Sequence, residues 1–119
     1  MQKDKLKRGQ FGEQVAKAYL KKKGYKIIEE NYKTKYGEID LICRQGKQLI
    51  FVEVRSKRGE NFGSPEESLD KRKLRKVWLN SQNYINYKKW PGAWRIDGVC
   101  LVLDYRDKLL RISHYQNIV

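Results

Sequence analysis

The sequence predicts an α/β fold in which helices flank a mixed β-sheet of about five strands. Residues 39–55 contain two runs rich in β-branched and apolar side chains, and the polar segment 45–48 separates them as in a hairpin. Helical patterns at 4–23 and 64–90 lie on either side of this hairpin, and a further apolar run follows at 94–103. The implied order is αβββαββ, in which a crossover helix joins two parts of one sheet.

The first helix is expected at residues 4–23. Its apolar residues recur at helical spacing, at Phe11, Val15, Ala18 and Tyr19. Gly24 follows three lysines and is a typical C-terminal stop. Gly9 and Gly12 should weaken the helix. Either they mark a close approach of the backbone to the sheet or a ligand, or the helix begins only near Gly12.

Three strands are expected between the two helices. The first covers residues 25–33, and an irregular connection follows at 31–36. The other two strands, at 39–44 and 49–55, form the hairpin. A two-residue type II′ turn with Gly46 in its first central place sets the register of this hairpin.

This register separates the side chains of the hairpin into two unlike faces. One face is wholly apolar and carries Ile39, Leu41, Cys43, Ile50, Val52 and Val54. The other face is mixed and carries Glu38, Asp40, Ile42, Phe51, Glu53 and Arg55. On the mixed face Asp40 lies directly opposite Glu53, where two carboxylates repel each other and lose hydration.

Two interpretations of this carboxylate pair are open. A divalent cation bound between Asp40 and Glu53 removes both costs, and oxygen ligands of this kind suit Mg²⁺, which completes its shell with water and substrate phosphate. Such a site indicates metal-assisted phosphodiester chemistry. Alternatively, both carboxylates pair with some of the many lysines and arginines and have only a structural role.

The polar segment 56–63 is expected to be a binding loop, and the second helix begins after it. Ser64 is the expected N-cap, Pro65 suits the first turn and Glu67 completes a capping box. The first half of the helix crowds five basic residues, Lys71, Arg72, Lys73, Arg75 and Lys76. These residues form either a solvated face or a phosphate-binding surface.

A stripe on the second helix is expected to pack it against the sheet: Leu74, Trp78, Ser81 and Ile85. The Trp-Pro-Gly sequence at 90–92 ends the helix. Residues 94–103 then form a central strand interrupted by Asp97, 104–108 form a turn, and 109–115 form an edge strand.

Composition and charge limit the classes of partner. The 119 residues correspond to one domain, 1–119. Lys and Arg number 27 against 14 Asp and Glu, and the net charge of +13 favours a polyanion, either nucleic acid or an anionic membrane surface. No apolar run approaches the length of a membrane span and the N-terminus has no signal-peptide pattern.

Cysteine and histidine usage limits the kind of site. Cys43 and Cys100 lie inside apolar strand patterns, so both are expected to be buried thiols of a cytoplasmic protein. His114 is the only histidine. Zinc sites and histidine-based catalytic triads are therefore nearly excluded.

Several of these residues match a known pattern: Gly9, Gly12 and Glu13; Asn31 and Tyr32; GEIDLI at 37–42; FVEVR at 51–55; Phe62, Gly63 and Pro65; Lys73; and Arg95, Ile96 and Asp97. The carboxylates and the FVEVR segment resemble the PD-(D/E)XK nuclease arrangement. Nearly the whole chain resembles the bacterial YraN family, also called the uncharacterised protein family UPF0102. The resemblance implies a restriction-endonuclease-like fold, related to that of archaeal Holliday junction resolvases.

The resemblance also implies roles for the matching residues. Asp40 and Glu53 would hold Mg²⁺ or Mn²⁺ together with the Val54 carbonyl, and Glu13 would bind a second ion or its water. Arg55 stands where active nucleases usually have lysine. Arginine keeps the charge and can fork onto a phosphate, but it cannot act as a base.

Lys57 lies two residues further along the same strand face, if the strand extends that far, and can then substitute for the usual lysine. The basic residues expected to contact nucleic acid, most of all DNA, are Arg55, Lys57, Arg58, Lys71, Arg72, Lys73 and Lys76. Many nucleases of this fold act as dimers, so a homodimer is also open.

Three functions compete at this stage. The first is a metal-dependent nuclease acting on structured or branched DNA, and the second is a non-catalytic nucleic-acid-binding module with a vestigial metal site. The third is a basic protein that binds RNA or a ribosomal surface. Glu13, Asp40 and Glu53 favour the first two, and Arg55 shifts weight towards the second. Membrane binding ranks last, because the second helix uses its apolar face for the core.

Overall fold

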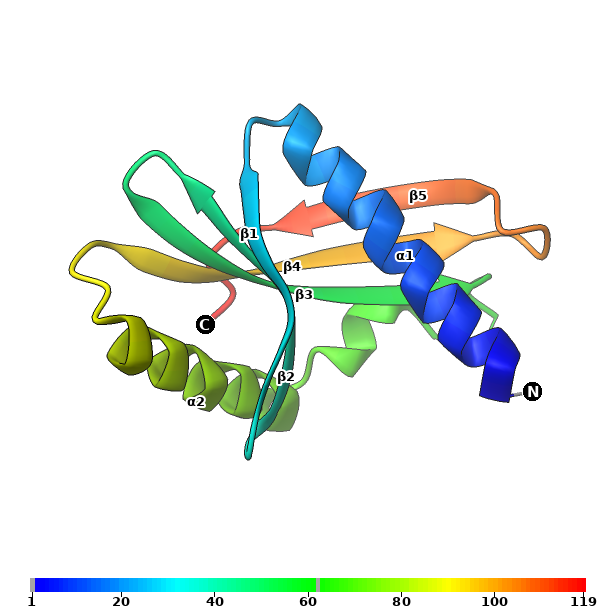
Figure 1. Cartoon of the computed structure of the whole chain (residues 1–119). Coiled ribbons are helices and arrows are strands. Elements are labelled where there is room, and N and C mark those ends of the chain that lie inside the picture. The colour runs from blue at the N-terminus through cyan, green and yellow to red at the C-terminus, as the bar shows by residue number, and fades with distance from the viewer. Residues whose placement is uncertain (1, 62) are drawn as a thin grey trace.

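The computed structural model describes residues 2–61 and 63–119, with side chains from residue 10 onward (Figure 1). Phe62, in the expected binding loop, lies outside the described residues. In chain order the elements are α1 (Gln2–Lys22), β1 (Lys26–Thr34), β2 (Gly37–Gln45), β3 (Gln48–Arg58), the 3₁₀ helix η1 (Pro65–Ser68), α2 (Lys71–Lys88), β4 (Trp94–Leu103) and β5 (Leu109–Tyr115). This is the predicted order with one short helix added.

The five strands form one sheet in the order β1-β2-β3-β4-β5. The pairs β1·β2, β2·β3 and β4·β5 are antiparallel, whereas β3 and β4 are parallel. A parallel pair needs a crossover connection, and η1 and α2 supply it. α1 packs on one face of the sheet and α2 on the other, so the predicted mixed sheet flanked by helices is confirmed (Figure 1).

Two apolar clusters join the helices to the sheet. The α1-side cluster includes Ala16, Leu20, Leu41, Ile50, Val52 and Leu101. The α2-side cluster includes Ile42, Phe51, Val77, Tyr84 and Ile96. Because a fully buried Leu, Ile, Val or Phe side chain contributes about 1.5–3 kcal/mol, these clusters fix the position of both helices.

Ile39 does not lie on the face predicted for it. It is fully buried in the α2-side cluster together with Ile42, whereas Leu41 belongs to the α1-side cluster. Residues three apart share a face only where the regular alternation of a strand is broken. The break falls at Asp40, opposite Asn31, which has a φ of 53° within β1.

α1 passes very close to β3 at Gly12. A Cβ atom at this position would lie 3.0 Å from the Ser56 Oγ atom. The helix already begins at Gln2, so the expected close approach to the sheet is confirmed and a helix start near Gly12 is wrong. This approach brings the next residue, Glu13, to the sheet.

The predicted second helix is divided in two. The Ser68 hydroxyl donates to the Pro65 carbonyl at 2.8 Å, a local bond that closes η1 as a separate turn. Asp70 caps α2 by accepting a backbone N–H of its first turn at 2.9 Å. Ser64 makes no capping hydrogen bond from its side chain. The predicted capping box of Ser64 and Glu67 is therefore wrong, because a carboxylate further along the chain provides the cap.

β2 and β3 are longer than predicted, whereas β1 has the predicted length but lies one residue further along the chain. Because β1 continues to Thr34, the irregular connection expected at 31–36 is wrong and only a tight turn at 35–36 remains. The Thr34 hydroxyl donates to Asn80 on α2, which holds this end of β1 against the helix. β3 continues to Arg58, so the loop after it is shorter than expected.

The last two strands have the predicted bounds, and β5 is an edge strand as expected. Cys43 and Cys100 are buried free thiols, again as predicted. In the described part of the chain, neither helix is long and apolar enough to cross a membrane.

Candidate functional site

The predicted site lies at the fork where β2 separates from β3. The predicted hairpin register is confirmed as far as the pair Leu41 and Val52. Beyond this pair Asp40 leaves the ladder, and its Oδ2 atom accepts the Val54 N–H at 2.7 Å. The prediction that Asp40 and Glu53 form a cross-strand pair is therefore wrong, although their side chains still interact at the same fork.

Glu53 is the most unusual residue at this fork. Its side chain is fully buried, yet neither carboxylate oxygen has a hydrogen-bond partner among the described residues. The Arg55 Nη2 atom lies 3.3 Å and the Lys73 Nζ atom 3.9 Å from Glu53 Oε2. Burial and the charge of Asp40 raise the pKa of Glu53 well above its ordinary value, although both cations oppose the shift. A carboxylate in this state lacks the partners that buried polar groups normally have.

α1 brings a third carboxyl group to the fork. Burial and the charge of Asp40 raise the pKa of Glu13 to about 7. Glu13 also lines a cavity of about 440 Å³ with Gln10, Phe11, Gln14, Glu30 and Asn31. Because Asn31 marks the break in β1, this cavity lies between α1 and the irregular part of the sheet.

The three carboxyl groups do not form a closed metal cage. Within the described part of the chain, no three His, Cys, Asp or Glu side chains converge closely enough to hold a metal ion by themselves. Mg²⁺ rarely uses such a cage: it takes one or two carboxylates and leaves its other positions to water and substrate. Asp40, Glu53 and the Val54 carbonyl are consistent with that partial type of site.

Arg55 folds back over the oxygen atoms that were predicted to be metal ligands. Its Nη1 atom donates to the Val54 carbonyl at 2.9 Å and lies 3.8 Å from Asp40 Oδ2. Its Nη2 atom is the one that approaches Glu53. A single guanidinium therefore contacts all three groups that were predicted to hold the first metal ion. Its positive charge lies next to these oxygen atoms.

The other basic residues of β3 point to opposite faces of the sheet. β3 pairs with β4 without interruption as far as Arg58, so Lys57 shares the face of Glu53 and Arg55. Arg58 lies on the opposite face and its Nη2 atom pairs with Asp107 at 2.8 Å. Lys57 therefore lies on the same face of the sheet as Glu53 and Arg55, as predicted. Arg58, which was also predicted to contact nucleic acid, lies on the other face.

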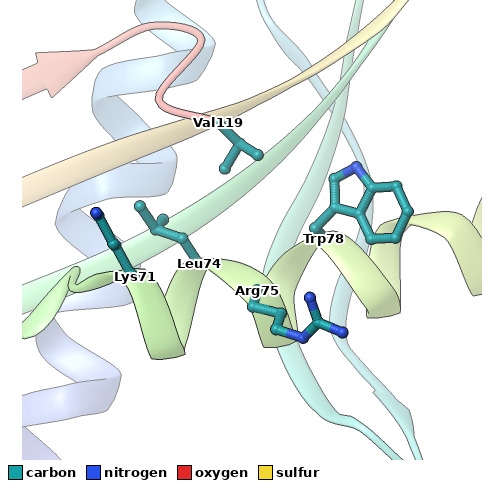
Figure 2. A pocket seen from close by; sticks show the side chains of 5 residues that line it. All are labelled: Lys71, Leu74, Arg75, Trp78 and Val119. Atoms are coloured by element: carbon teal, nitrogen blue, oxygen red, sulfur yellow. The ribbon is translucent and has the colours of Figure 1, made fainter.

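The first half of α2 carries the remaining residues that were predicted to contact nucleic acid. Lys73 reaches Glu53, whereas Lys71, Arg72 and Lys76 are exposed at the surface. Figure 2 shows Lys71 projecting from α2 beside the C-terminal tail. The first turn of this helix has no acidic residue, although the helix dipole favours acidic residues there.

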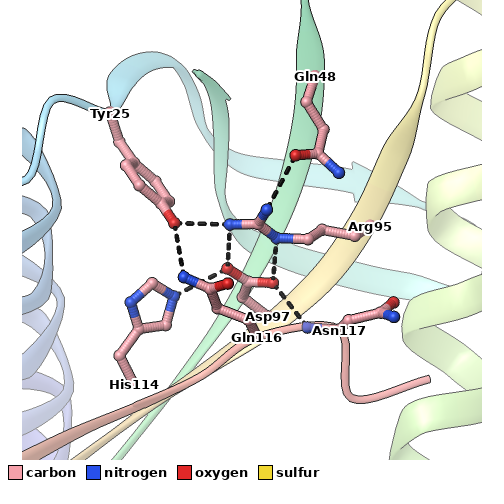
Figure 3. A network of polar contacts seen from close by, with 7 residues as sticks. All are labelled: Tyr25, Gln48, Arg95, Asp97, His114, Gln116 and Asn117. Atoms are coloured by element: carbon pink, nitrogen blue, oxygen red, sulfur yellow. Dashed lines mark hydrogen bonds and ion pairs between the residues drawn. The ribbon is translucent and has the colours of Figure 1, made fainter. Parts of the chain in front are cut away.

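A second polar cluster, on the α1 side of the sheet, was not predicted (Figure 3). Asp97 is fully buried, and Arg95 donates to both of its oxygens, from Nε at 2.9 Å and from Nη2 at 3.2 Å. His114 Nε2 lies 2.8 Å from Asp97 Oδ2, and the Asn117 N–H donates to Oδ1 at 3.0 Å. The Tyr25 hydroxyl completes the cluster by accepting Arg95 Nη2 at 2.6 Å.

This cluster joins the start of β4, the end of β5, the C-terminal tail and the residue before β1. Burial acts to raise the pKa of Asp97, but the hydrogen bonds from His114 and Arg95 outweigh it and hold the pKa below its ordinary value. One signal of this cluster was present in the sequence: Arg95 and Asp97 are two residues apart and therefore lie on the same face of a strand. His114 and Asn117 lie on a distant strand and tail, and no local pattern connects them to it.

Comparison with known proteins identifies relatives of this chain. The family model of the uncharacterised protein family UPF0102 matches residues 12–101. A UPF0102 protein of Clostridium beijerinckii is 38% identical over 110 residues, covering 92% of this chain and 89% of that protein. One from Moorella thermoacetica is 36% identical over 108 residues, covering 90% of each chain. One from Syntrophomonas wolfei is 52% identical over 66 residues, covering 56% of this chain and 57% of that protein.

The family match includes every element of the fork. It begins at Gly12, the residue of closest approach between α1 and β3, and it continues through Glu13, Asp40 and Glu53 into β4. The resemblance noted from the sequence is thus confirmed at the level of the family. The chain belongs to the uncharacterised protein family UPF0102.

Proposed function

We propose that this chain binds DNA and hydrolyses phosphodiester bonds in structured or branched DNA with the help of Mg²⁺ or Mn²⁺. The observation that carries the proposal is Glu53, a fully buried carboxylate whose oxygens have no hydrogen-bond partner among the described residues and only loose ion pairs with Arg55 and Lys73. Folding alone gives no reason to keep such a group, because a neutral side chain of the same shape would avoid the desolvation penalty. A bound cation supplies that reason.

The residues at the fork fit a hard divalent cation. Asp40, Glu53 and the Val54 carbonyl would hold it, and these are the three groups that Arg55 contacts. When bound, such an ion lowers the pKa of a water molecule and neutralises charge on a phosphate oxygen. Two strand carboxylates followed by a basic residue is the arrangement of PD-(D/E)XK nucleases, and we place the chain in that group as part of this proposal.

The remaining residues of the fork act on the substrate. Glu13, whose carboxyl group interacts with Asp40 at the fork, orients the attacking water. Arg55 withdraws from the carboxylates and stabilises the charge that develops on the phosphate, a role that needs only a fixed cation. Lys57 and Lys73, which lie on the same side of the sheet, add to this positive charge.

The basic start of α2 supports DNA as the partner. Its three consecutive basic residues, Lys71, Arg72 and Lys73, oppose the helix dipole and so reduce the stability of the helix. A phosphate backbone bound along this surface compensates for that loss, and the net charge of +13 favours the same partner.

Cleavage of DNA by matched variants tests the proposal. Wild-type protein is incubated in Mg²⁺ and in Mn²⁺ with duplex, single-stranded, flap and four-way-junction DNA. We expect cleavage of a branched substrate and a loss of more than about 100-fold in Asp40→Ala, because removing a ligand costs more than the 10–100-fold typical of outer-shell partners. Glu67→Gln, on an exposed carboxylate outside the fork, is the control and should cleave like wild type.

Equal cleavage by wild type and Asp40→Ala would reveal a contaminating nuclease. No cleavage of any substrate, by wild type or by Arg55→Lys, would contradict a catalytic role. That result would favour a second function, a non-catalytic DNA-binding module. The observation that supports this alternative is Arg55, which stands where active nucleases usually have lysine and which contacts Asp40, Glu53 and the Val54 carbonyl. Such a module would still bind DNA with a steep dependence on salt.

A further inference from the structure

Two neighbouring hollows lie along α2, away from the carboxylate fork. The first, of about 480 Å³, is lined by Lys71, Leu74, Arg75, Trp78 and Val119 (Figure 2). The second, of about 330 Å³, shares Leu74 with it and ends at Tyr115. Both aromatic side chains are 41% exposed, so one groove with an exposed ring at each end runs between α2 and the C-terminal tail.

Trp78 is not needed to pack α2 on the sheet. It was predicted as part of the packing stripe, but the α2-side cluster is built from other residues of the helix, Val77 and Tyr84, with Ile85 packed against them. Trp78 instead faces the hollow, next to the apolar side chains of Leu74 and Val119 (Figure 2). An exposed Trp over an apolar floor is a surface for binding a flat, hydrophobic group.

Two cations flank this aromatic surface. Figure 2 shows Lys71 on the far side of Leu74 from Trp78, and Arg75 projecting from the adjacent side of the helix. A ligand that suits both features has a flat ring and a negative charge close to it. An unpaired nucleotide has this chemistry, because its base stacks on aromatic rings and its phosphate pairs with lysine or arginine.

We propose that the groove binds an unpaired nucleotide of the DNA substrate, with its base stacked on Trp78 and the phosphates on either side of it held by Lys71 and Arg75. The inference rests on the proposed function and narrows its substrate class. Lys73 on the same helix reaches Glu53, and the next residue, Leu74, lines the groove. A single-stranded tail in the groove would therefore place its junction with the duplex near the carboxylate fork.

A second copy of the chain is a less suitable occupant. In a two-fold symmetric dimer the same patch meets itself, so Lys71 and Arg75 of one copy would approach the identical cations of the other. Like charges at an interface oppose association. The polyanionic partner relieves this repulsion, whereas an apolar partner does not.

Binding of tailed and blunt DNA by two aromatic variants tests the inference. Fluorescence anisotropy is measured without divalent metal, so that cleavage does not interfere, using a labelled blunt duplex and the same duplex with a single-stranded tail. We expect Trp78→Ala to weaken binding of the tailed DNA roughly 5- to 100-fold, the loss typical of one stacked base, with little change for the blunt duplex. Trp78→Phe should retain most of the affinity.

Tyr87→Ala is the matched control, because Tyr87 is a more exposed aromatic residue of the same helix that does not line the groove. It should bind both DNAs like wild type. An equal loss on tailed and blunt DNA, no loss at all, or a dimer in sedimentation that Trp78→Ala dissociates would overturn the inference. Trp78-dependent binding in a protein that cleaves nothing would instead support the groove and contradict only the catalytic function.

Discussion

Two buried carboxylates on adjacent strands, Asp97 of β4 and Glu53 of β3, differ in almost every respect except their burial. Asp97 receives hydrogen bonds from Arg95, His114 and a backbone N–H, whereas neither oxygen of Glu53 has a partner among the described residues. The pKa of Asp97 is lowered and that of Glu53 is raised. The hydrogen bonds of the Asp97 cluster compensate for the burial of its carboxylate, as folding requires. Glu53 lacks such hydrogen bonds, which is the basis of the proposal that a ligand binds there.

The two sites also differ in their nearest arginine. Arg95 forms a bidentate pair with Asp97, in which its Nε and Nη2 atoms donate to the two carboxylate oxygens at 2.9 and 3.2 Å. Arg55 instead spreads its contacts over Asp40, Glu53 and the Val54 carbonyl, and its distances to the two carboxylates are 3.8 and 3.3 Å. The looser contacts leave Arg55 easier to displace, which is what a binding site for a cation and a phosphate needs.

The largest expected effect comes from replacing each carboxylate by its amide. Asp97→Asn should lower the free energy of unfolding by about 3–5 kcal/mol, the usual result of breaking one partner of a buried ion pair. Glu53→Gln should change it by less than about 1 kcal/mol, since neither Glu53 oxygen has a hydrogen bond to lose and the amide avoids burying a charge. Urea unfolding of both variants measures the difference. Equal losses would show that the two carboxylates have the same structural role.

A smaller effect is expected in the dependence of stability on pH. The pKa of Glu13 is about 7 in the folded chain against an ordinary value of 4.5, so its contribution is present below pH 4.5 and is lost as the pH rises to 7. Asp97 acts in the other direction: its pKa is lowered from 3.8, so its contribution is present above that value and is lost as the pH falls through the folded pKa.

The melting temperature of metal-free protein should therefore fall between about pH 4.5 and pH 7, by the linkage of proton binding to folding. Glu13→Gln should reduce this decline, because the amide does not ionise, and the remainder belongs to Glu53, whose pKa is also raised. A thermal-unfolding series over this range is the measurement. A decline that is as steep in the variant as in wild type would assign the pH dependence to another group.

Strong local signals in the sequence were sufficient for much of the fold. β4 and β5 have their predicted bounds because an apolar run, a polar turn and a second alternating run succeed one another there. The hairpin register was correct from Gln45 to Leu41 because the glycine turn fixes it. The second helix was predicted to begin too early, because Ser64 and Glu67 have the residue types of a capping box, whereas Asp70 provides the actual cap of α2.

The candidate site was only partly predictable for a related reason. A period of two assigns the faces of a strand only while the strand is regular, and the break at Asp40 moved Ile39 to the other face. Asp40 and Glu53 were recognised from the hairpin register, and Glu13 was recognised because the family pattern connects it to them. The Asp97 cluster was missed because His114 and Asn117 come from elements far along the chain, which only the three-dimensional fold brings together.

The most direct test of the contrast between Glu53 and Asp97 is calorimetric titration of the intact protein with Mn²⁺ at neutral pH. We expect one class of site in wild type and in the Glu67→Gln control, and no binding in Asp40→Asn or Glu53→Gln, because each of these variants removes a charged ligand. Equal binding of Mn²⁺ to all four proteins would place the metal elsewhere. No binding to wild type would contradict the claim that Glu53 is left without hydrogen bonds in order to bind a cation.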